Sequence, residues 1–247
     1  MTSIEKGSQT AKDGFRNEDD IVIKFNNWKN DAEAQLWLQI MEYNFNEIEY
    51  VEAVKISGHK ADIQVQVTIK LTKAIDVENL QVKLVSNKKG FNQIDKRWLD
   101  KYEELWDIPN DVTYILKRYT GELSPTIINP KDKRRMFANE FSETEQNAVL
   151  NWLKENKSLI VNDILKGRGK FAAEWMLVAQ KINYNARWVL KPMNYCINFF
   201  GNGEVIITAR GNFNIGKIGI QRKGGDGGRK TANMLQFKID PTELFEE

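Results

Sequence analysis

Polar and apolar residues alternate along three segments in the first part of the chain, residues 51–56, 62–71 and 80–86. An alternation with a period of two is typical of a β-strand that buries one face. In the third segment Gln81 and Lys83 are two residues apart, so both side chains are expected on one face, opposite the apolar residues. The pattern therefore predicts a sheet of three strands with a polar face near residue 81.

Other segments carry apolar residues at helical spacing. Helices are predicted over residues 12–28, 31–46 and 93–106, the second of them capped by Asn30, and through most of the middle of the chain. The pattern Ser142-Glu143-Thr144-Glu145 predicts a helix start, because its Ser and second Glu can cap each other's backbone. Short apolar segments predict further strands over residues 175–179, 188–190, 205–209, 217–221 and 235–239.

The order of these elements is helix, sheet, helices and then a strand-rich tail. This order predicts an α/β or α+β fold in which a mixed central sheet is flanked by helices. We expect a catalytic core over residues 1–125 and a recognition region over residues 126–247. No linker rich in Pro, Gly or Ser marks the boundary, so one continuous domain is the alternative.

Composition argues against several classes of site. The 247 residues are 41% hydrophobic and 28% charged, which is typical of a globular protein with a substantial core. Cys196 and His59 are the only residues of their types, so neither a disulfide framework nor a zinc site is expected. Cys196 lies in an apolar run and is expected to be a buried thiol rather than a nucleophile. A polar N-terminus and the lack of an apolar segment of membrane-spanning length predict a soluble cytoplasmic protein.

The polar residues of the predicted sheet have the chemistry for phosphodiester hydrolysis, which needs a metal, an attacking water and a cation near the developing charge. Asp62 and Gln81 offer oxygen ligands, and the backbone carbonyl of Val82 is a further candidate. Lys83 is expected to hold the water or to stabilise the transition state. Mg²⁺ is the expected metal, because it takes oxygen ligands and keeps several waters. The alternative interpretation is a solvated strand face.

The wider sequence context favours catalysis. An Asp at the start of one strand, followed on the next strand by an acidic or amide residue, any residue and Lys, resembles the active-site motif of the PD-(D/E)xK nuclease superfamily. The form with Gln81 and Lys83 is similar to that of the small Type II restriction endonucleases related to MspI. The resemblance covers nearly the whole chain. It includes residues 80–96, 131–137, 167–175 and 220–226, which together resemble the type of enzyme that cuts within the palindrome GCGC after its first G.

The resemblance implies a PD-(D/E)xK nuclease core with a strand-rich C-terminal DNA-recognition region. It implies a magnesium-dependent endonuclease on double-stranded DNA, with a methyltransferase that protects the same sites as its functional partner. It favours one monomer at each DNA site, with a homodimer as the alternative. Ala61 departs from the usual Pro, which leaves the fine placement of Asp62 open, and the Gln81 amide replaces the common carboxylate, as in the subgroup.

Glu18 is a further candidate metal ligand. Many nucleases of this superfamily carry a Glu on the first helix that reaches the metal region, and Glu18, four residues after Gly14, fits that role. The alternative is a solvated helix residue beside Asp19 and Asp20.

DNA binding has to depend on local clusters, because the net charge is only +2. Lys88-Lys89-Gly90-Phe91-Asn92-Gln93 follows the catalytic strand directly, and its lysines can neutralise phosphates near the scissile bond. Phe91 is a large apolar residue in this polar loop. One hypothesis is that Phe91 wedges between base steps and bends the duplex, and the alternative is a loop anchor packed on Trp98 or Tyr102.

The Gly-rich segment 221–233 is the main candidate for reading bases. Arg and Lys pair with O6 and N7 of guanine, and Asp accepts from N4 of cytosine, which suits a site made only of G and C. A solvated hairpin loop is the alternative, and the other basic runs are candidates for backbone contacts or solvated faces. The expected DNA contacts are Lys12, Lys88, Lys89, Phe91, Asn92, Gln93, Lys96, Arg134, Arg135, Arg168, Gln221, Arg222, Lys223, Asp226, Arg229 and Asn233.

Two other functions are compatible with the sequence. One is a non-specific, structure-selective or repair nuclease of the same superfamily. The other is a non-catalytic DNA-binding protein with a nuclease-like fold, which the intact Asp62 and Lys83 argue against. A single active site on a palindrome requires either a dimer that spans both strands or sequential nicking.

Overall fold

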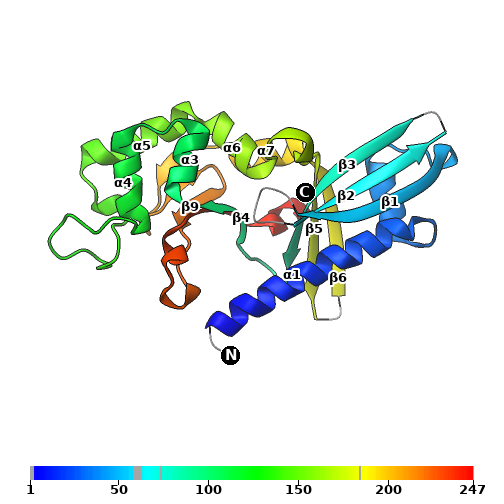
Figure 1. Cartoon of the computed structure of the whole chain (residues 1–247), viewed down its shortest axis with the longest axis horizontal. Helices are drawn as coiled ribbons and strands as arrows, with labels where there is room; N and C mark the ends of the chain where they lie inside the picture. Colours follow the sequence, from blue (N-terminus) through cyan, green and yellow to red (C-terminus); the bar gives the residue numbers. More distant parts are fainter. Residues whose placement is uncertain (1–2, 58–62, 73, 184, 247) are drawn as a thin grey trace.

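Two five-stranded sheets, with helices packed around them, form the part of the protein that the structure describes (Figure 1). The computed structural model describes residues 3–57, 63–72, 74–183 and 185–246. Across these ranges, none of the helices combines the length and the apolar character that a membrane span requires. The fold is of the α+β kind that the sequence pattern predicts.

The first sheet consists, in spatial order, of β1 (Ile48–Ser57), β2 (Ile63–Leu71), β3 (Ile75–Val85), β5 (Trp175–Ile182) and β6 (Asn185–Pro192). β1, β2 and β3 are antiparallel neighbours, β3 and β5 are parallel, and β5 and β6 are antiparallel. The sheet is therefore mixed, as predicted, and the strand that carries Gln81 and Lys83 is its central strand.

The second sheet consists, in spatial order, of β4 (Asn92–Arg97), β10 (Leu235–Ile239), β9 (Ile218–Arg222), β8 (Phe213–Ile215) and β7 (Val205–Ile207). All its strand pairs are antiparallel. Each sheet takes strands from both sides of residue 125, because β5 and β6 complete the first sheet and β4 joins the second. The expected division at residue 125 therefore does not coincide with the sheets.

The α-helices are α1 (Ser3–Asn26), α2 (Ala32–Ile40), α3 (Leu99–Trp106), α4 (Asn110–Thr120), α5 (Glu143–Glu155), α6 (Lys157–Leu165) and α7 (Met193–Gly201). Helix α1 lies against β1, β2 and β3, and α2 packs on α1 and β6. Helices α3 to α5 gather at the opposite end of the molecule from β1, and α6 and α7 lie between them and the first sheet (Figure 1).

Each face of the first sheet contributes to a different hydrophobic cluster. Leu80 and Val82 of β3 pack in the cluster that includes α1 and α2. The other face contributes to a cluster that extends through α3 to α7 and the second sheet. Met176 of β5 belongs to this second cluster and is the register partner of Gln81. Gln81 and Lys83 therefore lie on the face of β3 that points away from α1.

The segment predicted as one helix over residues 93–106 is a strand followed by a helix, so the prediction is wrong for its first half. β4 occupies the first part and α3 the second. Asp95 of β4 is paired with Phe237 of β10. The strand depends on a partner near the C-terminus, and the local spacing of apolar residues carries no information about that partner.

Two helix starts test the predictions of local capping. Asp31, not Asn30, caps α2, since its Oδ1 accepts a hydrogen bond from the backbone N of Ala34 at 3.0 Å. The predicted capping box of α5 is confirmed. The backbone N of Glu145 donates to Oγ of Ser142 at 3.3 Å, and the backbone N of Ser142 donates to Oε2 of Glu145 at 3.0 Å.

Helix α7 and strand β8 are not predicted by the sequence pattern. Helix α7 occupies the apolar run around Cys196, where apolar residues on several sides hide the helical period. Cys196 is fully buried, as predicted, and burial raises the pKa of its thiol to about 12. A thiol with so little thiolate is not a nucleophile at neutral pH.

Candidate active site

The two predicted catalytic residues of β3 lie in the buried part of the first sheet. Gln81 is 1% exposed and Lys83 is 6% exposed, and the two share a face of the strand. Gln81 is paired with Gln64 of β2, so the start of β2 runs beside the site. Asp62, the predicted carboxylate, lies outside the described residues, as does His59, and the role of Asp62 stays a prediction.

The amide oxygen of Gln81 is buried and has no hydrogen-bond partner within the part of the chain that the structure describes. An unsatisfied buried acceptor costs about 1–3 kcal/mol. A buried acceptor without a hydrogen-bond partner calls for an explanation in a native structure. Metal binding would supply one, because an amide oxygen is a good ligand for a hard cation such as Mg²⁺. The donor set therefore fits magnesium, with the Val82 carbonyl and the predicted Asp62 carboxylate as the other protein oxygens.

The ammonium group of Lys83 is held by a backbone carbonyl in the segment that follows β3. Its Nζ donates a hydrogen bond to the backbone carbonyl of Gln93 at 3.2 Å. Gln93 belongs to β4 in the second sheet, so this bond joins the central strand of one sheet to the edge strand of the other. The position of the Lys83 cation therefore depends on how β4 of the second sheet lies against β3.

The loop between β3 and β4 presents an apolar ring to solvent. Phe91 is 67% exposed. A ring exposed to this degree is not buried against Trp98 or Tyr102, so the interpretation of Phe91 as a packed loop anchor is wrong. Lys88 and Lys89 are exposed in the same loop, directly after the strand that carries Lys83.

Helix α1 buries a polar residue that the sequence predictions did not single out. Asn17 is 1% exposed, and among the described residues neither its Nδ2 nor its Oδ1 has a hydrogen-bond partner. Asn17 continues the buried stripe of Ile21 and Phe25 toward the helix N-terminus. The sequence feature that could have singled it out is a polar residue at a position of the stripe where an apolar residue is expected. The predicted ligand Glu18 is its neighbour and is partly buried, and its metal contact stays a prediction.

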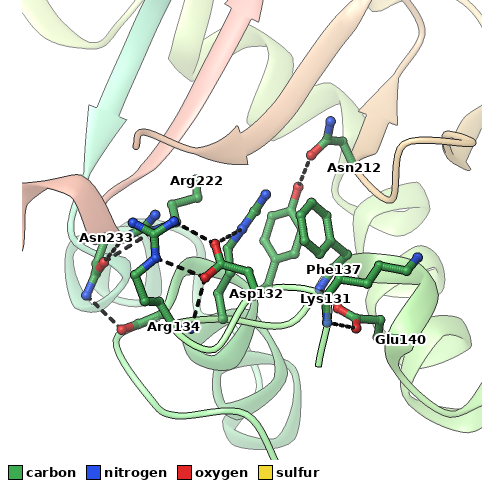
Figure 2. A network of polar contacts seen from close by, with 11 residues as sticks. Lys131, Asp132, Arg134, Phe137, Glu140, Asn212, Arg222 and Asn233 are labelled. Carbon is green, nitrogen blue, oxygen red and sulfur yellow. Dashed lines mark hydrogen bonds and ion pairs between the residues drawn. The ribbon is translucent and has the colours of Figure 1, made fainter. Parts of the chain in front are cut away.

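Three arginines gather around one carboxylate where β9 approaches the segment between α4 and α5 (Figure 2). Asp132 accepts hydrogen bonds from Nε and Nη2 of Arg134, both at 2.9 Å, and lies 3.9 Å from Nε of Arg135. The hydrogen bond from Arg134 lowers the pKa of the Asp132 carboxyl. With Arg222, three cations face a single anion, so this arginine cluster attracts a negatively charged partner.

Arg222 is held in a fixed orientation within the arginine cluster (Figure 2). Its Nε and Nη2 donate to Oδ1 of Asn233 at 3.2 and 2.7 Å, and Nδ2 of Asn233 donates to the carbonyl of Gly121 at 2.7 Å. Burial lowers the pKa of Arg222, and the neighbouring cations of Arg134 and Arg135 lower it further. A guanidinium held in one plane is suited to bidentate recognition.

The Gly-rich segment forms a loop between β9 and β10. Its base is closed by a hydrogen bond from the backbone N of Gly224 to the carbonyl of Ala232 at 2.9 Å. Gly224 and Gly225 have φ angles of +67° and +64°, and a Cβ at either position would meet no atom within 4 Å. The backbone here is open to a close approach by a partner, and it uses a conformation that glycine adopts without strain.

The Gly-rich loop and the first helix meet. The short helix η5 (Asp226–Gly228) contacts α1, the helix that carries Lys12, so two predicted DNA-binding segments lie side by side (Figure 1). The side chains of Lys12 and Asp226 are outside those that the structure describes.

Arg168 makes contacts within the protein. Its Nε donates to Oδ1 of Asp163 at 2.7 Å, its Nη2 pairs with the same carboxylate, and Nη2 also donates to the carbonyl of Leu105 at 3.2 Å. These contacts join α6 to the end of α3. A run of basic residues in the sequence does not reveal such a structural role. A contact between Arg168 and DNA stays a prediction. The other predicted contacts are partly exposed at Asn92, Gln93, Lys96, Gln221 and Lys223 and exposed at Arg229.

The structure thus brings the predicted residues into two groups. Gln81, Lys83 and residues 88–93 lie at the junction of the two sheets. Arg134, Arg135, Arg222 and Asn233 belong to or support the arginine cluster. Arg168 has none of its described partners in either group.

Comparisons with known proteins identify relatives of this chain. A family model described as R.HinP1I restriction endonuclease matches residues 41–245. Among solved structures, restriction endonuclease MspI in complex with its cognate DNA is similar with a TM-score of 0.64 and 14% sequence identity, over 96% of this chain and 93% of that chain. A search of the curated proteins found no match. At this level of identity, the structural similarity shows that the two chains share a fold.

Proposed function

The chain belongs to the R.HinP1I restriction endonuclease family, and from this premise we propose that it hydrolyses phosphodiester bonds in double-stranded DNA within the palindrome GCGC. One observation carries the chemistry. The buried amide oxygen of Gln81, without a hydrogen-bond partner in the described part of the chain, shares a strand face with the buried ammonium of Lys83. These two groups are costly to bury in a strand that only supports the fold, and they suit metal-assisted hydrolysis.

The metal of this site is Mg²⁺ in our proposal. Its protein ligands are the Asp62 carboxylate, the Gln81 amide oxygen and the Val82 carbonyl, with Glu18 of α1 as a further candidate. When bound, Mg²⁺ polarises the phosphate and lowers the pKa of a coordinated water. Lys83, held by the Gln93 carbonyl, orients the attacking water or stabilises the charge that develops on the phosphate.

Two kinds of DNA contact are proposed. The exposed Lys88 and Lys89 follow the catalytic strand and bind phosphates near the scissile bond. In the arginine cluster, Asp132 fixes the guanidinium of Arg134 and Asn233 fixes that of Arg222. Fixed guanidinium planes favour bidentate pairing with O6 and N7 of guanine over a contact with phosphate alone.

Phe91 is proposed to wedge between base steps and bend the duplex. The support is its exposure of 67% in a loop that starts at the catalytic strand. An exposed aromatic ring gains apolar contacts when it enters a base stack, and the unstacking cost is recovered through the closer contact that a bent duplex allows.

In the cell, the proposed functional partner is a methyltransferase that protects the same sites, and the proposed location is the cytoplasm. One protein monomer binds each DNA site, and a homodimer is the alternative. Because one chain has a single active site, a monomer has to cut the two strands of the palindrome in succession. A nicked plasmid is therefore the expected intermediate of cleavage.

Digestion of a plasmid of known sequence tests this function. With Mg²⁺ we expect discrete fragments whose sequenced ends lie after the first G of GCGC, and with a chelator we expect no cleavage. A preference for branched substrates would instead indicate a repair nuclease. Sequence-independent cleavage would indicate a non-specific nuclease, and DNA binding without cleavage would indicate a non-catalytic protein.

Substitution of Lys83 tests the catalytic assignment. We expect Lys83→Ala to lower the single-turnover cleavage rate by about 10³-fold and to change the DNA dissociation constant only a few-fold, because the ammonium acts mainly on the transition state. Lys154→Ala, at an exposed lysine of α5, is the control for loss of a positive charge. Equal cleavage rates for the two variants would remove Lys83 from the mechanism.

A further inference from the structure

A buried glutamine of β5 contacts the loop that presents Phe91. Gln180 is 4% exposed and is the register partner of Val85, the last residue of β3. Its Nε2 donates hydrogen bonds to the backbone carbonyls of Asn87 and Lys88 at 2.7 and 3.2 Å. One side chain therefore holds two consecutive peptide groups at the start of the loop between β3 and β4.

The orientation of the Gln180 amide is set from its other end. Arg187 is the register partner of Gln180 on β6, and its Nε donates to Oε1 of Gln180 at 2.6 Å. Because Oε1 accepts from a cation, Nε2 has to face the loop carbonyls. The guanidinium of Arg187 lies over the ring of Phe245, 4.2 Å from its centroid, which holds the arginine in place.

A second contact holds the far end of the same loop. The backbone N of Gly90 donates to Oδ2 of Asp240 at 3.2 Å. Asp240 is buried, and its Oδ1 accepts from the backbone N and Oγ1 of Thr242 at 3.1 and 2.6 Å. The loop backbone is therefore held at both ends, while the ring of Phe91, next to Gly90, stays exposed.

This arrangement matters for a loop that has to insert a ring into DNA. A loop that is ordered only on binding loses conformational entropy at that moment, and a loop that is already held loses less. The held segment continues to Gln93, whose carbonyl accepts from Lys83. Gln93 itself is fixed by the pairing of β4 with β10, so the contacts of Gln180 and Asp240 act on the part of the loop that carries Phe91.

We propose that Gln180 is a positioning residue, which orders the loop between β3 and β4 so that Phe91 meets the base stack. This inference rests on the proposed function, because it requires Phe91 to bend DNA. Gln180 then affects DNA bending and cleavage, in addition to any stability that it contributes to β5.

A double-mutant cycle with Phe91 tests the inference. Gln180→Met keeps the size of the side chain and removes its hydrogen-bond donor, and Phe91→Ala removes the ring. The two single variants, the double variant and the unmodified protein are compared on a short duplex that contains the mapped cleavage site and carries a fluorescent dye at each end. Energy transfer between the dyes reports bending, and single-turnover kinetics with Mg²⁺ report cleavage.

We expect Gln180→Met to reduce the energy-transfer change and to slow cleavage about 10-fold when Phe91 is present, and to have less than about a 2-fold effect in the Phe91→Ala protein. Gln146→Met is the matched control. Nε2 of Gln146 donates to the carbonyl of Phe141 at 2.8 Å, so this variant loses a similar bond in α5 and should bend DNA normally.

Three results would overturn the inference. Equal effects of Gln180→Met with and without Phe91 would mean that Gln180 acts through general stability. If Gln180→Met bends and cleaves DNA normally while Phe91→Ala is defective, the role of Gln180 is refuted and the proposed Phe91 wedge still stands. Normal bending by Phe91→Ala would remove the proposed wedge, and this inference with it.

A second variant covers the case in which Gln180→Met does not fold. Gln180→Glu preserves the shape of the side chain and its contact with Arg187, but it places a carboxylate oxygen against two carbonyl oxygens. We expect a loss of bending that again depends on Phe91. A loss that is independent of Phe91 would overturn the inference.

Discussion

At the scale of single residues, β3 and α1 each bury an amide with atoms that lack a hydrogen-bond partner, and other such atoms in the described part of the chain include atoms of Tyr102, Arg118 and Arg135. Gln81 and Asn17 each bury amide atoms that have no hydrogen-bond partner among the described residues. Each such atom costs about 1–3 kcal/mol, which an apolar residue at the same position would avoid. Both residues lie on elements that carry predicted metal ligands, Gln81 on β3 and Asn17 on α1 beside Glu18.

The first prediction separates stability from activity at Gln81. We expect Gln81→Met to keep or raise the melting temperature, because an unsatisfied acceptor is replaced by an apolar group of similar size. We expect the same variant to lose cleavage by about 10²-fold or more, because a metal ligand is lost. Calorimetry and single-turnover cleavage measure the two effects.

Gln146→Met is the control, for which we expect the opposite effects on stability and on cleavage. Its amide makes a hydrogen bond, so we expect a lower melting temperature and an unchanged cleavage rate. A Gln81→Met protein that cleaves at the normal rate would contradict the assignment of Gln81 as a ligand.

At the scale of elements, the start of α5 combines a helix cap with an ion pair. Glu145 belongs to the capping box of α5, and its Oε1 accepts from Nη2 of Arg118 at 2.5 Å. Arg118 of α4 is 5% exposed, so the pair joins two helices through a buried cation. Removing the carboxylate leaves that cation without its anionic partner.

The second prediction concerns the pH dependence of this contact. Burial alone would raise the pKa of the Glu145 carboxyl, but hydrogen bonds from Arg118 and Ser142 outweigh burial and lower it. A group with a lowered folded-state pKa stabilises the protein above its unfolded value, near 4.5, and the contribution is lost as the pH falls through the folded-state value. We expect Glu145→Gln to cost about 2 kcal/mol of unfolding free energy at pH 7.

Urea unfolding at pH 7 and below pH 4 measures this effect. The difference between Glu145→Gln and the unmodified protein should shrink at the lower pH. Glu143→Gln, at an exposed glutamate of the same helix turn, should change the free energy by less than about 0.5 kcal/mol at either pH. A pH-independent cost at Glu145 would show that its charge is not involved.

The third prediction concerns the arginine cluster, which joins β9 to the segment after α4. We expect Asp132→Asn to weaken binding to a GCGC duplex by about 10-fold, because Arg134 loses the carboxylate that fixes its plane. Binding to a scrambled duplex should become tighter at low salt, because one negative charge is removed. Fluorescence anisotropy at two salt concentrations measures both affinities.

Asp111→Asn is the control for charge, at an exposed aspartate of α4. It should leave the ratio of specific to non-specific affinity unchanged. Equal ratios for Asp132→Asn and Asp111→Asn would mean that the arginine cluster binds DNA by charge alone.

At the scale of the whole molecule, the two sheets are interleaved along the chain. β3 is central in the first sheet only because β5 lies beside it, and β4 lies in the second sheet because it pairs with β10. The loop between β3 and β4, which contains Phe91, therefore passes from one sheet to the other (Figure 1). This exchange of strands links the proposed catalytic residues to the proposed DNA-contacting residues.

The fourth prediction follows from the interleaving. We expect a fragment of residues 1–125 to show no cooperative unfolding transition, because β3 loses β5 and becomes an edge strand with its buried residues exposed to water. The full chain should unfold with a single dominant transition in circular dichroism and calorimetry. A cooperative transition in the fragment would show that the first half of the chain is a domain in its own right.

The sequence by itself determined features that belong to one segment. The strands around Gln81 and Lys83, their shared face, the cap at Ser142 and the strand over residues 235–239 all follow from periods and capping chemistry that act over a few residues. The resemblance that rests on these motifs led to the family and to the fold. The bonds of Gln180 to the loop carbonyls lay beyond such local rules.

Only the tertiary structure decided features that need two distant segments. β4 is a strand because β10 supplies its partner, Asn17 is buried because α1 packs on the first sheet, and Asn233 meets Arg222 across the Gly-rich loop. Gln180 contacts Asn87 and Lys88 because β5 lies parallel to β3. Each of these contacts depends on which faces of the chain exclude water together, and that is a property of the whole packed molecule rather than of any one segment.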